Sequence, residues 1–231
     1  YGLLNDIRRI SQAELPRTVQ HFVQLGRPRH STLEISPPLP RLVAHPHAVA
    51  NILDRLGIQP SEQPVLAICP GAAFGPAKRW PPAYFAQIAQ QQLLRGWQVW
   101  LIGSQEDARI TAEISGTGSP YLYDLAGRTR LEDVVDLLSV ASCVISNDSG
   151  LMHVAAAVDT PVIALFGSTS PKINPPLSPR ATILWRELSC SPCHQRSCPL
   201  GHTNCLHELS VDQVQEALTR ATETSIRVGA P

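Results

Sequence analysis

From residue 64 onward, short apolar runs alternate with stretches in which apolar residues recur at helical spacing. The apolar runs predict buried strands over residues 65–69, 98–102, 143–146 and 161–166, with a weaker strand over 121–125. Helices are predicted over 83–94, from Ser104 to Ile114, after Thr129, over 151–158 and from Ser210 to Thr224. Strands that are apolar throughout and alternate with helices are typical of a parallel sheet covered on both faces. The predicted class is therefore α/β, with a Rossmann-like, doubly wound parallel sheet.

Turn-forming and capping residues delimit several of these helices. Thr129 with Glu132, and Ser210 with Gln213, have the spacing of a capping box, in which side chain and backbone of the two residues bond reciprocally. Gly57 is placed to end a helix over 48–56, because glycine readily adopts the left-handed conformation that follows a helix.

The first 60 residues have a different pattern. Residues 11–25 predict an amphipathic helix, and five prolines between Pro28 and Pro46 predict an extended linker. We divide the chain into a remnant of another domain plus linker at 1–60, a main domain at 61–209 and a terminal helix at 210–231. The single methionine, Met152, lies far from the start, so we expect further sequence upstream of Tyr1.

The fold class indicates where a ligand would bind. In doubly wound sheets, ligands lie beyond the carboxyl ends of the strands. The loops to search therefore follow Cys69, Ile102, Leu125, Ser146 and Phe166. Two of these loops carry residues suited to a phosphorylated ligand.

Residues 146–157, SNDSGLMHVAAA, run from a buried strand through a turn into a short helix. Free backbone N–H groups and the positive end of the helix dipole make such a turn an anion site, and Gly150 lets a phosphate approach closely. Asp148 would repel a phosphate but suits sugar hydroxyls, and His153 lies one turn further along. The alternative is an ordinary helix cap by Asp148 or Ser149.

Residues 70–81, PGAAFGPAKRWP, follow the first strand of the main domain. The loop presents Lys78 and Arg79 ahead of a helix, where a cation stabilises the charge that develops on a diphosphate leaving group. The spacing to Ser or Thr is not that of a P-loop. The alternative is a solvated Lys–Arg pair.

Four of the six cysteines lie in one loop, 190–205, together with His194 and His202 and close to His207; they are Cys190, Cys193, Cys198 and Cys205. Thiolates at this short spacing predict a structural zinc site. An iron–sulfur cluster, two local disulfides or thiols without metal fit the same residues, so a metal is weighed evenly against its absence. Cys69 and Cys143 lie in apolar runs and are expected to be core residues.

Charge and hydropathy narrow the classes of partner. The chain carries 19 Lys and Arg against 19 Asp and Glu, which gives no reason to expect nucleic acid. No apolar run approaches the ~20 residues of a membrane-spanning helix, and we expect no secretory leader. A reducing cytoplasm is the expected location.

The segments PGAAFGPAKRWP and NDSGLMHVAAA, in this order, together resemble glycosyltransferase family nine. DLAGRT at 124–129 and ALFGSTSP at 164–171 also match the family pattern. The resemblance extends over essentially the whole chain. Within the family it is strongest to the enzymes that add heptose to the inner core of lipopolysaccharide.

The resemblance implies a GT-B fold, in which two Rossmann-like domains face a cleft and the carboxy-terminal one binds a nucleotide sugar. It assigns Lys78 to the diphosphate, and it assigns Asp148, Ser149 and Gly150 to sugar and phosphate. Lys78 and Asp148 are the expected catalytic residues. The other residues expected at the donor are Ala73, Phe74, Gln105, Gly127, Leu131 and His153.

The resemblance also implies the reaction, an inverting transfer of heptose from ADP-heptose to the lipopolysaccharide inner core that requires no cofactor. The general base is expected in an upstream domain, so this chain alone is expected to bind the donor without turnover. Peripheral contact with the inner face of the inner membrane is implied. Two alternatives remain: another GT-B transferase or epimerase with a different nucleotide sugar, and a non-catalytic metal-knuckle interaction module on a Rossmann scaffold.

Overall fold

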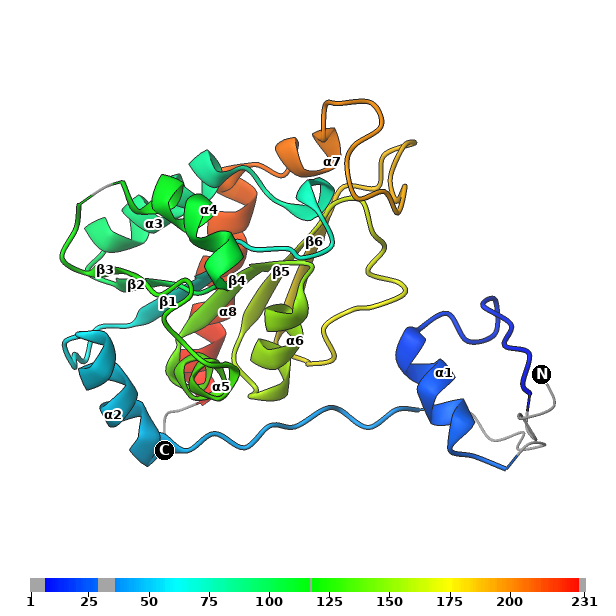
Figure 1. The fold of residues 1–231 in the computed structure, drawn as a ribbon, viewed down its shortest axis with the longest axis horizontal. Helices are drawn as coiled ribbons and strands as arrows, with labels where there is room; N and C mark the ends of the chain where they lie inside the picture. Colours follow the sequence, from blue (N-terminus) through cyan, green and yellow to red (C-terminus); the bar gives the residue numbers. More distant parts are fainter. Residues whose placement is uncertain (1–6, 29–35, 117, 229–231) are drawn as a thin grey trace.

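The computed structural model describes residues 7–28, 36–116 and 118–228, and six strands in these residues form one sheet (Figure 1). The strand order is β3-β2-β1-β4-β5-β6, and all neighbouring strands are parallel. The order is that of a doubly wound Rossmann-like sheet, which confirms the predicted fold class. The strands are β1 (Val65–Cys69), β2 (Gln98–Leu101), β3 (Leu122–Asp124), β4 (Cys143–Asn147), β5 (Val162–Phe166) and β6 (Ala181–Trp185).

Helices cover both faces of the sheet and bury two separate apolar clusters. On one face lie α2 (Pro46–Leu56), α5 (Leu131–Val140) and α6 (Gly150–Ala157). On the other lie α3 (Pro82–Leu94), α4 (Ala108–Ser115), the short α7 (Asn204–His207) and α8 (Val211–Val228). Two single turns, η1 (Pro76–Lys78) and η2 (Gln105–Asp107), and the amino-terminal α1 (Thr18–Leu25) complete the described elements.

The central strand β1 shows why the apolar runs are continuous. Ala67 and Cys69 pack into the cluster under α5 and α6, whereas Leu66 and Ile68 pack into the cluster under α3 and α8. Leu66 and Ile68 are fully buried, and burying one such side chain stabilises the fold by about 1.5–3 kcal/mol. Because both faces of such a strand are buried, its residues are apolar throughout and do not alternate with polar ones.

The edge strand β6 was not predicted from the sequence. Its residues are half-buried to exposed, because it pairs only with β5 and lies at the border of the sheet. The run 181–185 therefore lacks the continuous apolar character of the central strands.

The predicted cap of α5 was wrong by one residue. Arg130, not Thr129, precedes the helix, and its backbone N–H donates to the Asp133 carboxylate at 2.8 Å. Asp133 is buried and also pairs with Arg55, whereas Glu132 is exposed. The capping box before α8 is confirmed, with reciprocal bonds of 3.2 and 3.0 Å between Ser210 and Gln213.

The amino-terminal part differs from the prediction in one respect. The helix predicted over 11–25 is observed only as α1, because Pro16 disfavours helical backbone at the residue before it. An extended segment over 36–45 leads from this part to α2 at the edge of the sheet domain (Figure 1). Residues 29–35 of the predicted linker, the opening residues 1–6 and the last three residues of the predicted terminal helix lie outside the described residues. In the described part of the chain, no helix is both long and apolar enough to cross a bilayer.

Candidate functional site

At the centre of the sheet, between β1 and β4, the direction in which successive strands are added reverses. Strands β1 and β4 are neighbours, but β1 leads on to β2 on one side and β4 leads on to β5 on the other. The loops that leave their carboxyl ends therefore diverge and leave a crevice, the usual ligand position in this fold. These loops are residues 70–81 and the turn at 148–150, the two segments singled out in the sequence.

Side chains from three loops meet at this crevice. The Lys78 ammonium donates to Asp148 Oδ2 at 2.6 Å, and both side chains are largely buried, at 13% and 8% exposure. The Thr169 hydroxyl, from the loop after β5, donates to the same carboxylate oxygen. We call Lys78, Asp148 and Thr169 the Lys78 cluster. The two sequence segments thus share one site, and the lysine is not a solvated surface residue.

A buried asparagine, Asn147, holds the loop that carries Lys78. Its Oδ1 accepts the Trp80 N–H at 3.0 Å, and its Nδ2 donates to the Pro70 carbonyl at 2.7 Å. Asn147 therefore ties both ends of the 70–81 loop to the end of β4. Trp80 is itself fully buried and donates its indole N–H to the Leu209 carbonyl at 2.8 Å. No motif or spacing in the sequence predicts this role for Asn147, although it is the last residue of β4 and directly precedes the Asp-Ser-Gly turn.

The turn into α6 is not an ordinary side-chain cap. Ser149 occupies the N-cap position with extended backbone, and its hydroxyl makes no capping hydrogen bond but lies 3.3 Å from the Ser146 hydroxyl. Asp148 directs its carboxylate to Lys78 and Thr169 instead. Within the residues that the structure describes, the N-cap side chain therefore leaves the first backbone N–H groups of α6 uncapped, as in helices that bind anions.

His153 lies on α6 within the electrostatic influence of this cluster. Partial desolvation lowers the pKa of His153 from its ordinary value; Asp148 raises it and Lys78 lowers it by smaller amounts. The imidazole is therefore biased toward its neutral form, which can both donate and accept a hydrogen bond.

A pocket of about 460 Å³ opens beside the turn at 148–150, between the ends of β1 and β2 and the start of α5. Its volume lies in the range of small-ligand sites. Of the residues predicted to contact the donor, four line it: Ala73, Leu131, Ser149 and Gly150. Asp148 of the Lys78 cluster directly precedes Ser149, which lines the pocket, whereas the three residues of the cluster are not among the residues that line it.

Two predicted donor residues, Gln105 and Gly127, lie against one another outside the pocket lining. Gly127 has a positive φ of 71°, and a Cβ there would overlap the Gln105 side chain. The acidic residue that does line the pocket is Asp107. Its carboxylate accepts the backbone N–H and hydroxyl of Ser104 at 2.9 and 2.8 Å and packs where a Cβ at Gly71 would stand. The resemblance places Gln105 at the donor, whereas Asp107, two residues further along the chain, is the residue that lines the pocket.

Phe74 contacts the Lys78 cluster from the other side. The Lys78 ammonium lies 4.9 Å from the centre of the Phe74 ring, and the Arg196 guanidinium lies 5.7 Å from it. Phe74 is 37% exposed, so its ring also faces solvent. The structure thus places a second cation, from the cysteine-rich loop, near the first.

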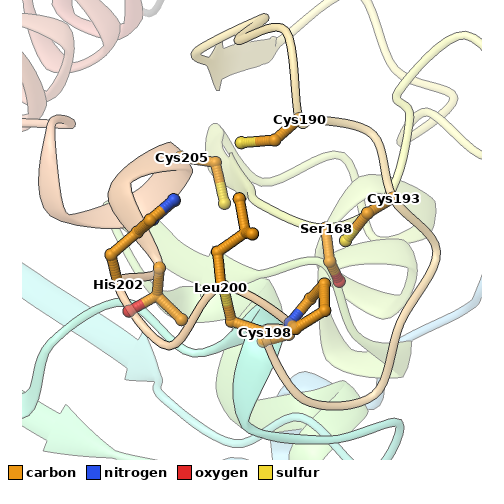
Figure 2. Close-up of a pocket in the computed structure, with 10 residues that line it drawn as sticks. Ser168, Cys190, Cys193, Cys198, Leu200, His202 and Cys205 are labelled. Carbon is orange, nitrogen blue, oxygen red and sulfur yellow. The ribbon is translucent and has the colours of Figure 1, made fainter.

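The four clustered cysteines line a second, much smaller cavity, of about 20 Å³ (Figure 2). All six cysteines of the chain are free thiols. Among the described residues, no three His, Cys, Asp or Glu side chains are already arranged as a metal site. Cys69 and Cys143 are core residues, as predicted, and burial raises the pKa of each thiol to about 12.

Comparisons with known proteins agree with one another. Residues 1–204 match the sequence profile of glycosyltransferase family 9 (heptosyltransferase). Lipooligosaccharide heptosyltransferase 2 of Haemophilus influenzae is 40% identical over 80% of this chain and 56% of its own length. Lipopolysaccharide heptosyltransferase 2 of Salmonella typhimurium is 34% identical over 94% of this chain and 65% of its own length.

A solved structure agrees with the sequence matches. The structure of the E. coli ADP-heptose lipopolysaccharide heptosyltransferase II superposes with a TM-score of 0.86 at 32% identity, over 97% of this chain and 67% of that one. The chain spans 56% and 65% of the length of the two curated relatives. From the profile match and these similarities, the chain belongs to glycosyltransferase family 9.

Proposed function

We propose that the protein transfers heptose from ADP-heptose to the inner core of lipopolysaccharide, and that the described sheet domain binds the donor. The observation that carries the proposal is the Lys78 cluster beside the 460 Å³ pocket, at the point where the sheet reverses direction. The names of the relatives supply the donor and the acceptor class. The ligand positions follow from the chemistry of each part of the site.

The adenosine occupies the pocket, and the diphosphate lies over the amino-terminal end of α6. Apolar pocket walls such as Leu131 and Val134 suit a nucleobase, whereas the α6 N–H groups and Lys78 suit phosphate oxygens. Asp107 takes the ribose hydroxyls, because its carboxylate lines the pocket and Gln105 does not. Gln105, which the family resemblance places at the donor, lies against Gly127 in this structure.

Donor binding changes the partner of Lys78. In the structure, Asp148 neutralises the ammonium at 2.6 Å. A diphosphate carries more negative charge than one carboxylate, so it draws Lys78 toward itself and leaves Asp148 to accept hydrogen bonds from sugar hydroxyls. Thr169 holds that carboxylate in place during the exchange.

In the reaction, an acceptor hydroxyl attacks the anomeric carbon, the bond to the β-phosphate oxygen breaks, and ADP leaves. Negative charge develops on the phosphate in the transition state, where Lys78 and the α6 N–H groups stabilise it. The general base that takes the hydroxyl proton comes from the acceptor-binding domain that GT-B enzymes pair with this one. The transfer itself requires no metal.

The acceptor sets the proposed location. A lipopolysaccharide precursor is anchored in a membrane, so the enzyme works in peripheral contact with the cytoplasmic face of the inner membrane. The described residues contain no helix that could span it.

Calorimetric titration of the chain with ADP, UDP and GDP tests the donor class. We expect ADP to bind most tightly. A preference for UDP or GDP would replace ADP-heptose by another nucleotide sugar. No binding of any nucleotide would favour a non-catalytic interaction module and overturn the proposal.

Two substitutions test the assigned roles. Lys78→Ala should weaken ADP binding about tenfold or more, because one hydrogen bond to a charged group contributes ~1.5–3 kcal/mol. Asp148→Ala should leave ADP binding intact or strengthen it, since it removes a competing anion, but should weaken binding of ADP-heptose. Arg220→Ala, on the exposed side of α8, is the control that removes a cation without touching the crevice. Unchanged ADP binding in Lys78→Ala together with unchanged ADP-heptose binding in Asp148→Ala would remove the site assignment.

A further inference from the structure

The cysteine-rich loop contains the densest group of reactive side chains outside the crevice. Figure 2 shows Cys190, Cys193, Cys198 and Cys205 surrounding one space, with sulfur atoms on its rim. Cys205 is buried at the start of α7, and the other three are half-buried. We call these four residues the cysteine cluster. The cavity that they line holds about 20 Å³, which is room for one small atom rather than for an organic ligand.

The loop backbone turns tightly between Cys198 and Cys205. The Gly201 N–H donates to the Cys198 carbonyl at 3.1 Å, and the Leu206 N–H donates to the Thr203 carbonyl at 2.9 Å. Two positive φ angles, 75° at Gly201 and 47° at Thr203, occur within this turn. The turn brings Cys198 and Cys205 to the same cavity.

A buried hydroxyl also faces the cavity. Ser168 is 1% exposed and lines the space with the four cysteines, yet its Oγ has no hydrogen-bond partner in the described part of the chain. An unpaired buried hydroxyl costs free energy unless a ligand satisfies it. A thiolate sulfur bound to a cation is an acceptor for such a donor.

Mutual repulsion explains why a cation is needed. Cys190, Cys193, Cys198 and Cys205 all line one cavity of about 20 Å³, so thiolates at these positions would lie close to one another. Four thiolates in one small cavity therefore cannot ionise together without a positive charge among them. A divalent ion supplies that charge, and the displaced thiol protons pass to solvent.

We propose that the cysteine cluster binds one soft divalent metal ion, zinc or iron, through four thiolates, and that this ion fixes the 190–205 loop against the turn that carries Lys78. Zinc–thiolate bonds are about 2.3 Å long, and no three such ligands already stand in this arrangement. Binding therefore includes an inward movement of the four sulfur atoms.

The loop contacts the crevice directly, which gives the metal site a role in donor binding. The Arg196 carbonyl, between Cys193 and Cys198, accepts the Ala77 N–H at 3.1 Å, one residue from Lys78. The His194 N–H donates to the Ser168 carbonyl at 2.7 Å, beside Thr169. The loop thus holds the backbone next to two members of the Lys78 cluster. This role rests on the proposed function, whereas the metal site itself does not.

Metal analysis of the protein, purified without oxygen or chelators, tests the site. We expect about one zinc or iron per chain, since four-thiolate sites bind a single ion. Cys193→Ser and Cys198→Ser should each lose the metal, and Cys143→Ala, in the core of β4, should keep it. Replacement by cobalt should give the intense visible bands of tetrahedral thiolate coordination. Metal-free wild-type protein with four reactive thiols, or with two disulfides after alkylation and mass spectrometry, would overturn the proposal even if the variants fail to fold.

Calorimetry with ADP before and after metal removal tests the link to the crevice. We expect removal to weaken ADP binding by about 2- to 30-fold, the range of couplings between neighbouring sites. Bound metal with no ADP binding at all would overturn the proposed function and leave the metal site. Protein that carries no metal when it is purified without oxygen or chelators, and that still binds ADP, would overturn the metal site and leave the proposed function. Unchanged ADP affinity after metal loss would overturn the link alone.

Discussion

The Lys78 cluster and the cysteine cluster lie on neighbouring loops but are built in opposite ways. Asp148 is 70 residues from Lys78 and 21 from Thr169, so the sheet brings the three side chains together. All four cysteines lie within residues 190–205, in a loop with little secondary structure of its own. The comparison separates what the sheet alone brings together, the Lys78 cluster, from what the proposed metal ion would draw together, the cysteine cluster.

The largest expected change in the free energy of unfolding comes from removing the side chain that holds the loop of Lys78. Asn147→Ala leaves the Trp80 N–H and the Pro70 carbonyl buried without their partner. Each unpaired group costs about 1–3 kcal/mol, so the free energy of unfolding should fall by about 2–6 kcal/mol. Urea denaturation followed by tryptophan fluorescence measures the loss.

Ser146→Ala is the matched control for this variant. It removes a buried polar group from the same strand, but the Ser146 hydroxyl donates only to the Asn147 carbonyl, at 2.8 Å, and faces Ser149. We expect a loss within about 1 kcal/mol. Equal losses for the two variants would show that the sheet, not Asn147, fixes the 70–81 loop.

A smaller effect is expected at the contact between the two clusters. Gly75 has a φ of 153°, and a Cβ there would overlap the Arg196 carbonyl oxygen. Gly75→Ala should therefore destabilise the protein by about 1–3 kcal/mol and weaken both metal and ADP binding. Gly116→Ala meets no atom within 4 Å and should be neutral. Thermal unfolding and the two binding assays check both variants. If Gly75→Ala changes neither stability nor binding, the cysteine cluster and the Lys78 cluster do not influence each other.

The smallest effect, one of labelling rather than stability, distinguishes the cysteine cluster from the core thiols. Burial raises the pKa of Cys69 and Cys143 to about 12, so roughly one molecule in 10⁴ carries either thiolate at pH 8. After metal removal, iodoacetamide should label the half-buried Cys190, Cys193 and Cys198 in native protein and all six cysteines after unfolding. Cys198 should react first, because backbone hydrogen bonds lower the pKa of its thiol. Rapid labelling of Cys143 in native protein would contradict the burial of β4.

Sequence patterns predicted the parts of the molecule that burial controls. Apolar runs located β1, β2, β4 and β5 to within one residue at most ends, because both faces of these strands are covered. They missed β6, whose side chains are half-buried to exposed. The α5 cap was missed because the choice between Glu132 and Asp133 depends on Arg55, a residue distant in sequence.

The candidate site was predictable in position but not in detail. The fold rule places the loops of Lys78 and Asp148 at one edge of the sheet, whatever their side chains. No spacing rule predicts that the two would pair with each other, that Thr169 would join them, or that Asn147 would tie the loop ends. These contacts depend on rotamers and on which backbone groups are left unsatisfied, and a single sequence does not contain that information.

Because Asp148 forms an ion pair with Lys78, its carboxylate competes for the lysine with any anion that enters the crevice. Any negatively charged molecule must displace the carboxylate before it gains the lysine. Inorganic phosphate has nothing else with which to offset that displacement, whereas a nucleoside diphosphate also fills the neighbouring pocket. The proposed donor therefore has an advantage over inorganic phosphate, because it gains the neighbouring pocket as well as the lysine.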